Sequence, residues 1–324
     1  MRAMIVDEWC EPKDMRLKEL PDPQPGPGQV AIDVKAAGCN FFDILIAQGK
    51  YQVKPPRPFS PGGEVAGVIR AVGPEVRDRR VGDRVFAMLG WGGYASVCLA
   101  PAAGVVRMPD AMPFEHGAAF GVVYQTSYFG LVYRAALQPG ETLLVHAAAG
   151  GVGLAAVQIG TALGARVLAT AGSAAKLEVA RQHGAEAAFD YSTPAWVEQV
   201  REATGGRGAD VIYDPVGGDI FDLSTKCIAF GGRLLVIGFA SGTIPTLQVN
   251  RVLLKNISIV GLHWGAYRQH DPAKIPQAMA ALFELYARGA VTPLVSSQYP
   301  LAEAAKALDE IAARRSVGKV LLIP

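Results

Sequence analysis

The sequence of 324 residues lacks the cysteine patterns that mark zinc-stabilised or disulfide-stapled proteins. Its four cysteines, Cys10, Cys39, Cys98 and Cys227, are scattered and form no C-x-x-C pair. Structural zinc sites use closely spaced ligand pairs, and disulfide frameworks occur in short secreted chains. We therefore expect neither, and interpret all four thiols as buried and unreactive.

The chain also lacks an excess of charge of either sign. It carries 31 basic and 29 acidic residues, for a formal net charge of +2. The densest basic segment, Arg77 to Arg84, is interrupted by Asp78 and Asp83. Because a nucleic-acid-binding surface needs a continuous basic patch, we expect no nucleic-acid partner and interpret this segment as a solvated loop.

Apolar runs long enough to span a membrane are absent as well. Three uncharged stretches, residues 86–106, 116–133 and 142–165, are each interrupted by glycine, proline or polar residues, whereas a spanning helix needs about 20 predominantly apolar residues. The segment from Met1 to Asp7 lacks the apolar core of a signal peptide. We expect a cytoplasmic protein with no membrane partner.

The length of the chain and a change in its sequence pattern indicate two domains, because a single hydrophobic core usually stops growing near about 250 to 300 residues. Short apolar runs separated by proline and glycine clusters make residues 1–121 β-rich. From residue 122 on, strands alternate with helices, which predicts a doubly wound parallel sheet of the α/β class. The six strands expected there are 142–145, 166–170, 187–191, 211–216, 233–238 and 257–262. The tail, with helices over 273–285 and 302–313 and a strand over 319–323, is expected to fold back onto the first domain.

The most informative segment is His146–Gly153, which follows an apolar strand and precedes a helical pattern. Ala147, Gly150 and Gly153 have the spacing A-x-x-G-x-x-G, a variant of the dinucleotide-binding G-x-G-x-x-G motif. Glycines let the backbone approach a pyrophosphate, and the helix start offers free N–H groups and the positive end of its dipole. The residues expected to bind the cofactor here are Ala149, Gly150, Gly151 and Val152.

The next strand ends without an acidic residue. In NAD-binding proteins an Asp or Glu about 20 residues after the glycines binds the ribose hydroxyls, but this chain has Ala171 to Lys176 there. The Ser173 hydroxyl and the Lys176 ammonium suit an additional 2′-phosphate, which a carboxylate would repel. The sequence therefore favours NADPH over NADH. The alternative is that Lys176 only solvates the first turn of the following helix.

Across its whole length the chain resembles the medium-chain dehydrogenase/reductase superfamily, and within it the zinc-free quinone oxidoreductase branch related to ζ-crystallin. The motifs that carry the resemblance are Gly38–Asp43, Pro61–Gly67, Val81–Val85, Gly92–Ala95 and His146–Gly164. It implies a GroES-like catalytic domain, residues 1–121 and 266–324, and a Rossmann domain, residues 122–265. In the zinc alcohol dehydrogenases a Cys and a His that bind the catalytic zinc fill the positions of Asn40 and Gly63. Neither residue here is such a ligand, so we expect no metal.

The resemblance also implies roles for single residues. It places Asn40 and Tyr51 near the nicotinamide and the acceptor, and Thr126 at the nicotinamide ribose or ring. Asn40 could instead cap a turn, and Tyr51 could cover an edge of the barrel. The residues it places at the adenine and 2′-phosphate are Gly172, Ser173, Lys176, Tyr191 and Arg314. For the last position the adjacent Arg315 is the alternative. Gly238 and Phe239, at a strand end, are expected to meet the nicotinamide.

The expected reaction is zinc-independent hydride transfer from NADPH to a quinone. Donors such as the Asn40 amide or the Tyr51 hydroxyl would stabilise the developing oxyanion. One alternative is reduction of an activated C=C bond in an enone, enal, haloacrylate or enoyl thioester, and another is a non-catalytic NADPH-binding protein, crystallin-like or RNA-binding. The resemblance further implies a homodimer, for which the β-branched segment Ile257–Val260 would suit the shared sheet edge.

Overall fold

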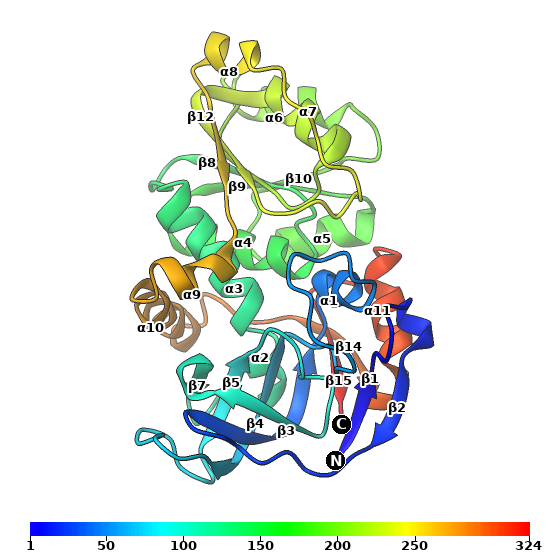
Figure 1. Ribbon diagram of the computed structural model, residues 1–324. Coiled ribbons are helices and arrows are strands. Elements are labelled where there is room, and N and C mark those ends of the chain that lie inside the picture. Colours follow the sequence, from blue (N-terminus) through cyan, green and yellow to red (C-terminus); the bar gives the residue numbers. More distant parts are fainter. The chain divides into compact units, whose positions relative to one another are not determined.

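The computed structural model describes all residues 1–324, and the chain divides into two compact units. The first unit comprises Met1–Val122 and Pro293–Pro324, and the second comprises Val123–Thr292. In Figure 1 the first unit holds the blue, cyan and red segments, and the second runs from green to orange. Two of the chain's segments thus build one unit, whereas the other unit is continuous in sequence.

The second boundary lies at Thr292, not at residue 265 as expected, because the segment that carries helix α10 (Lys274–Ala287) belongs to the second unit. Gln158 fixes the end of this segment: its Nε2 donates to the Thr292 carbonyl at 3.0 Å, and its Oε1 accepts from the Thr292 N–H at 2.9 Å. These paired bonds join the segment to helix α4 (Gly151–Ala162). Hydrophobic periodicity alone gave no sign of such a long-range polar anchor.

The first unit is built on a mixed sheet with the path β14-β15-β3-β4-β5-β7, in which β6 also pairs with β3. The strands are β3 (Gln29–Gly38), β4 (Glu64–Val72), β5 (Arg84–Met88), β6 (Val97–Pro101), β7 (Val105–Arg107), β14 (Val295–Pro300) and β15 (Lys319–Ile323), with a separate pair β1 (Arg2–Ile5) and β2 (Arg16–Glu19). Alternating apolar side chains of β3, such as Val30, Ile32 and Val34, lie in the core. Strand β15 pairs antiparallel with β3, so the tail folds back onto the first domain.

Short helices complete the first unit. They are α1 (Phe41–Ala47), α2 (Phe114–Ala118) and α11 (Ala304–Ala312), with 3₁₀ turns at Pro12–Asp14, Ala102–Gly104 and Leu301–Glu303. Ala304, Ala307 and Leu308 repeat at helical spacing and bury one face of α11 in the core.

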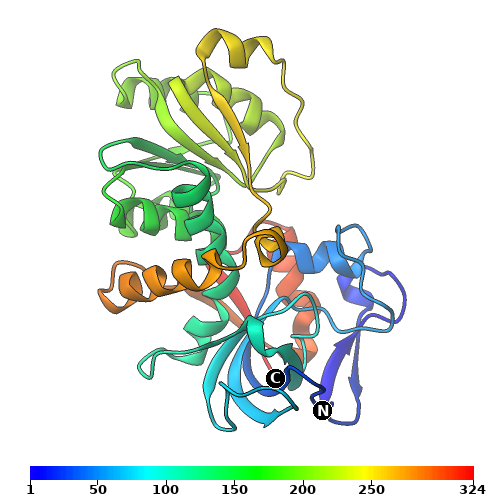
Figure 2. The same cartoon turned by 60° about the vertical axis from the view of Figure 1, so that its left-hand side comes forward.

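The second unit contains a parallel sheet with the order β10-β9-β8-β11-β12-β13. Its strands are β8 (Thr142–Val145), β9 (Arg166–Ala171), β10 (Ala187–Asp190), β11 (Ala209–Asp214), β12 (Ile228–Val236) and β13 (Ser258–Gly261), and they are clearest in Figure 2. Numbered within the unit, this is the order 3-2-1-4-5-6 of doubly wound nucleotide-binding folds, so the expected fold class is confirmed. Strand order reverses between β8 and β11, where such folds bind ligands.

Helices cover both faces of this sheet: α4 and α5 lie on one side and α6 and α7 on the other (Figure 1). The helices of the unit are α3 (Gly121–Tyr128), which begins in the first unit, α4, α5 (Ala174–Gln182), α6 (Trp196–Ala203), α7 (Gly218–Cys227), α8 (Asn250–Lys255), α9 (Tyr267–His270) and α10, with a π-helical turn at Phe129–Arg134 and a 3₁₀ turn at Trp264–Ala266. The central strand β8 is fully buried, as expected for a sheet covered on both faces.

The segments around β12 and β14 are among those that differ from the sequence prediction. The helix expected over residues 220–230 ends at Cys227, and β12 already begins at Ile228. The pair Gly231 and Gly232 explains this, because Gly231 has φ +74° and a Cβ on Gly232 would lie 2.6 Å from Ile228 Cγ1. Strand β14 was not expected at all, since its alternating partly buried and exposed residues end in a proline.

Two further sequence expectations concern apolar stretches and thiols. No helix is both long and apolar enough to cross a membrane. All four cysteines are unpaired, and Cys39, Cys98 and Cys227 are buried as expected, but Cys10 is half-exposed. Burial raises the pKa of each thiol, so the thiolates are disfavoured.

Candidate active site

The glycine turn that is expected to bind the pyrophosphate follows β8 in the second unit. Ala147 has φ +49°, and its carbonyl oxygen accepts the Gly150 N–H at 2.9 Å. A Cβ on Gly153 would lie 2.2 Å from that same oxygen, so only glycine permits the close approach. Gly150 then occupies the N-cap of α4, whose first N–H groups have no partner within the helix. The turn therefore presents a positive helix end suited to an anion.

Two hydroxyl groups fix the start of α4. Ser127 Oγ donates to the Val152 carbonyl at 2.9 Å and lies 2.9 Å from Tyr213 Oη. Because the Ser127 hydrogen is used on the carbonyl, Tyr213 donates to Ser127. Both side chains are buried. Thr126, the preceding residue of α3, is partly exposed.

The residues expected at the adenosine end come together where β9 and β10 end. Ser173 caps helix α5, and its Oγ accepts the Lys176 N–H at 3.4 Å. A Cβ on Gly172 would lie 3.4 Å from Tyr191 Cε2, so the tyrosine ring lies directly beside this glycine. Gly172 and Ser173 are exposed and Lys176 is partly exposed. A hydroxyl, an ammonium and an aromatic ring thus flank a segment without carboxylates, which fits a phosphorylated ribose.

Two loops that pack on each other follow β11 and β12, at the strand ends that are expected to meet the nicotinamide. Buried Asp214, the last residue of β11, accepts the N–H groups of Val216 and Gly217 at 2.8 and 3.0 Å on Oδ1. Burial raises the pKa of Asp214 to about 6. Gly217 has φ +71°, and its Cβ position lies 3.0 Å from Phe239 Cδ1. The loop with Gly238 and Phe239 therefore packs on the β11 loop, an arrangement the sequence did not disclose.

His146, beside the glycine turn, is structural. Its Nδ1 lies 2.7 Å from Thr170 Oγ1 and its Nε2 lies 2.8 Å from Ser224 Oγ. Ser224 donates to the Ile220 carbonyl at 2.6 Å, so Nε2 carries the hydrogen and Nδ1 accepts from Thr170. Burial lowers the pKa of His146 to about 3. His146 is therefore a neutral imidazole whose two nitrogens are both hydrogen-bonded within the second unit.

The first unit contains a buried charged cluster around Asn40, which stands at the N-cap of α1. Lys319 Nζ donates to the Cys39 carbonyl at 2.9 Å, to Asn40 Oδ1 at 2.8 Å and to Glu64 Oε1 at 2.7 Å. Glu64 Oε2 accepts the Val122 N–H at 2.8 Å. The side chains of Lys319 and Glu64 are only 4% and 1% exposed. Sequence reasoning named Asn40 but neither charged partner.

A second carboxyl, Asp43, lies beside this cluster with no exposed surface. Its Oδ2 accepts the Asn40 N–H at 2.8 Å and the Tyr94 hydroxyl at 2.9 Å, whereas Oδ1 has no partner. Burial raises the pKa of Asp43 to about 7, although the Tyr94 and Asn40 hydrogen bonds oppose the shift. This carboxyl therefore titrates near neutrality, unlike an exposed aspartate.

Tyr51 combines the two roles considered for it. Its ring stacks on Phe42, with centroids 5.6 Å apart and planes at 28°, and packs against the core of the first unit. Its hydroxyl makes no hydrogen bond within the chain, and burial raises the pKa of the phenol. The group is thus a protonated donor without an internal acceptor.

Comparison with known proteins agrees with both units. A family model described as alcohol dehydrogenase GroES-like domain matches residues 26–110, and one described as zinc-binding dehydrogenase matches residues 151–284. Quinone oxidoreductase-like protein 2 of Bos taurus is 39% identical over 322 residues, 99% of this chain and 92% of that protein. Human quinone oxidoreductase is 34% identical, over 100% of this chain and 98% of that one. The crystal structure of Escherichia coli quinone oxidoreductase complexed with NADPH has a TM-score of 0.93, at 31% identity and full coverage of both chains.

The chain belongs to the quinone oxidoreductase-like group of the medium-chain dehydrogenase/reductase superfamily. The expected resemblance is therefore confirmed, and with it the GroES-like and Rossmann-like nature of the two units.

Zinc, which the second family description names, does not fit the residues of the first unit. A Cβ on Gly63 would lie 2.2 Å from Phe42 Cζ, so a phenyl ring fills the space where zinc dehydrogenases have a ligating histidine. Asn40 Oδ1 already faces an ammonium group, which repels a cation. No group of three or more His, Cys, Asp or Glu side chains is arranged to hold a metal ion.

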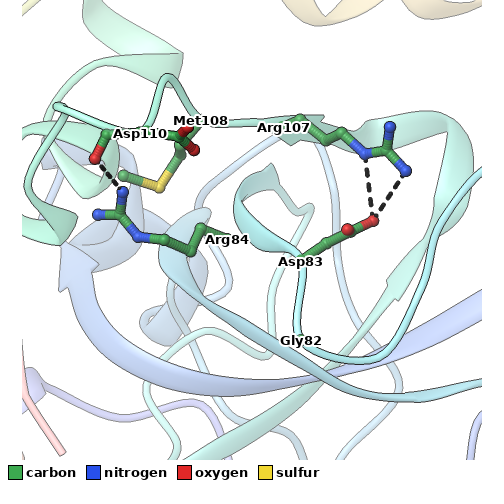
Figure 3. A pocket seen from close by; sticks show the side chains of 6 residues that line it. All are labelled: Gly82, Asp83, Arg84, Arg107, Met108 and Asp110. Atoms are coloured by element: carbon green, nitrogen blue, oxygen red, sulfur yellow. Dashed lines mark hydrogen bonds and ion pairs between the residues drawn. The ribbon is translucent and has the colours of Figure 1, made fainter.

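A small surface pocket of about 290 Å³ in the first unit is lined by none of these residues (Figure 3). Its two arginines are paired locally: Arg107 pairs with Asp83 at 3.0 Å, and Arg84 donates to the Asp110 and Met112 carbonyls. The arginines of this pocket are therefore engaged within the first unit.

Arg314 lies in the first unit, just after α11, with φ +56°. Its N–H donates to the Ile311 carbonyl at 3.0 Å, which ends the helix. Arg315 pairs with Asp309 at 2.7 Å. The role of either arginine at the cofactor stays a prediction.

Proposed function

We propose that this protein is an NADPH-dependent, zinc-independent reductase that transfers a hydride to a quinone. The observation that carries the proposal is the pairing, within one unit, of the Ala147–Gly153 turn with a strand end that offers Ser173 and Lys176 and no carboxylate. Similar proteins named quinone oxidoreductase, one of them complexed with NADPH, support it.

The second unit holds the cofactor. N–H groups at the start of α4, from Gly150 to Val152 and with Ala149 beside them, bind the pyrophosphate. The phosphorylated adenosine is held by Gly172, Ser173, Lys176 and Tyr191. Thr126, Gly238 and Phe239 contact the nicotinamide end. When bound, the cofactor supplies the hydride.

The first unit serves the acceptor. Reduction of a quinone to a hydroquinone by one hydride leaves an oxyanion that needs one further proton. Tyr51, with a protonated and internally unpaired hydroxyl, donates a hydrogen bond to that oxygen, and solvent supplies the proton that is consumed overall. Phe42 holds the Tyr51 ring in place by stacking.

The test is NADPH consumption by stopped flow against a panel of quinones, enals and enoyl thioesters. We expect the highest kcat/KM with quinones. Faster turnover of enals or enoyl thioesters would instead identify a C=C reductase, and tight NADPH binding without turnover of any acceptor would identify a non-catalytic protein. Tyr51→Phe is expected to lower quinone turnover about tenfold or more at unchanged NADPH affinity. Equal turnover of every acceptor by this variant excludes the role given to Tyr51.

We further propose a homodimer joined along β13, the edge strand of the parallel sheet. Large apolar side chains that are 72–78% exposed gather in the adjoining segments of the second unit, namely Phe230, Ile244, Val249, Leu253 and Leu254. An unpaired strand edge beside such side chains is typical of an interface. Light scattering should give twice the chain mass, and Leu253→Glu/Leu254→Glu should give a monomer; a wild-type monomer at micromolar concentration excludes the dimer.

A cytosolic location is part of the same proposal. Cys39, Cys98 and Cys227 are buried free thiols, which are typical of proteins from reducing compartments. Cell fractionation with antibody detection checks this, and recovery of the protein in a membrane or secreted fraction contradicts it.

A further inference from the structure

The strongest further feature is the buried pair of Lys319 and Glu64 beside Asn40, and its interpretation rests on the proposed function. Lys319 is the first residue of β15 and Glu64 is the first of β4. Their atoms Nζ and Oε1 are 2.7 Å apart, and neither side chain has more than 4% of its surface exposed. Burying an ion pair costs desolvation energy and is weak evidence for stability, so a role beyond folding is worth testing.

The pair dictates the orientation of the Asn40 amide. Oδ1 accepts from Lys319 Nζ at 2.8 Å, and Nδ2 donates to Glu64 Oε1 at 3.0 Å. If the amide were turned over, its N–H groups would face an ammonium that can only donate, and its oxygen would face a carboxylate that can only accept. Two favourable hydrogen bonds would become two repulsive contacts. The two charges therefore select one of the two amide orientations.

A count of donors shows what this orientation leaves for a ligand. The second Nδ2 hydrogen of Asn40 donates to the Gly38 carbonyl at 3.3 Å, so both amide hydrogens are used. All three Lys319 hydrogens are used as well, on Cys39, Asn40 and Glu64. The Asn40 oxygen accepts from Lys319, and the capping box of α1 brings the Asp43 N–H to the same side chain. Asn40 is 8% exposed and has no hydrogen left to donate.

We propose that Lys319 and Glu64 are positioning residues that hold Asn40 as a hydrogen-bond acceptor and prevent it from acting as a donor. Asn40 then meets a bound ligand only as an acceptor through Oδ1, and never through an N–H group. The expectation that its amide donates to the developing oxyanion does not fit this arrangement, because no hydrogen is left for that bond. Donation to the acceptor falls to Tyr51.

The first test observes Asn40 without cofactor or turnover. The chain has three asparagines, Asn40, Asn250 and Asn256, and the last two are exposed. Selective ¹⁵N-asparagine labelling therefore gives three side-chain amide signals, and Asn40→Ala identifies the first. We expect the Asn40 amide protons to exchange with solvent at least about tenfold more slowly than the other two pairs, because both are hydrogen-bonded. Exchange of all three at similar rates overturns the proposal.

The second test removes both charges together. Lys319→Met/Glu64→Gln leaves no unpaired buried ion, so the fold is expected to persist, and circular dichroism checks this. We expect a loss of about tenfold in quinone kcat/KM, with NADPH Kd changed less than about threefold, since misplacing a site group mainly affects the reacting complex. The matched control is Lys306→Met/Glu303→Gln, which removes an exposed pair of the same unit, 68% and 39% exposed, and should leave both quantities unchanged. Lys319→Arg, which keeps the charge, should recover part of the activity and the slow exchange.

A double-mutant cycle separates positioning from a general structural effect. If Lys319 and Glu64 act through Asn40, their double replacement has little further effect on kcat/KM once Asn40 is alanine. Equal losses with and without Asn40, or no loss in the wild-type background, overturn the proposal. The amide-exchange measurement needs no turnover, so a protein that reduces no quinone but shows the protected Asn40 amide would refute the proposed function and retain the orientation of Asn40.

Discussion

The candidate sites of the two units are built from different kinds of groups. In the second unit, the cofactor residues come mostly from short stretches of sequence, and many of their contacts use backbone groups, as in the Ala147–Gly153 turn. In the first unit, buried charged side chains meet from strands far apart in the chain; Glu64 and Lys319 are separated by 255 residues. A site made of backbone groups can therefore be recognised in a short stretch of sequence, whereas a site made of distant side chains forms only in the completed fold.

The largest effect is expected from a substitution in the buried ion pair of the first unit. Lys319→Met leaves Glu64 buried without its cation, which should lower the free energy of unfolding by about 3–5 kcal/mol. Adding Glu64→Gln removes the stranded charge and should restore most of the loss. Urea unfolding of both variants measures this, and an equal loss in the single and double variants would mean that packing, not charge, holds the site together.

Gly153→Ala tests the backbone contacts of the glycine turn in the second unit. The added Cβ would meet the Ala147 oxygen at 2.2 Å, and a strain of up to about 3 kcal/mol corresponds to roughly 100-fold weaker NADPH binding. Fluorescence titration measures the affinity. Gly90→Ala is the matched control, because no atom lies within 4 Å of its Cβ position. Wild-type affinity in the Gly153 variant would contradict the close-approach argument.

Lys176→Ala sharpens the comparison, because Lys176 is a charged side chain in a site made largely of backbone. Losing a charge-assisted contact to the 2′-phosphate should weaken NADPH binding about tenfold or more and leave NADH binding unchanged. Lys226→Ala, an exposed lysine of the same unit, serves as the control. Equal weakening of both coenzymes would show that Lys176 does not read the phosphate.

Asp43 is expected to make the stability of the protein depend on pH. Its pKa is raised from 3.8 to about 7 in the folded protein, so between about pH 4 and pH 7 the unfolded chain has released a proton that the folded chain keeps. Stability therefore falls as pH rises through this window, by at most about 1.4 kcal/mol per pH unit, and levels off above it. Groups that bond to or act on Asp43 are Asn40, Tyr94, Glu64 and Lys319.

The measurement compares wild type with Asp43→Asn, which keeps an acceptor for Tyr94 but does not titrate in this range. Other groups contribute to the pH profile of both proteins, so the difference between the two unfolding free energies isolates Asp43. A difference that stays constant from pH 4 to pH 8 would contradict the raised pKa.

Local sequence sufficed for much of the fold, and it pointed to the residues that we propose bind the cofactor. The strand, glycine turn and helix around Gly150 are contiguous, and so are Gly172, Ser173 and Lys176. The partners of Asn40 could not be read in this way, because a lysine at the start of an apolar strand, such as Lys319, is typical of a solvated strand end. Glu64 and Asp43 lie inside motifs that carry the family resemblance. A charged residue within such a motif was the one sign in the sequence that these side chains belong to the site.

The divided construction of the first unit has a consequence for synthesis. A nascent chain that has reached Thr292 contains the whole second unit, which can fold on its own segment. At that stage strand β3 still lacks its neighbour β15, and Glu64 still lacks Lys319. The first unit must therefore remain incomplete, with an open sheet edge and an uncompensated carboxylate, until the later segment has been synthesised.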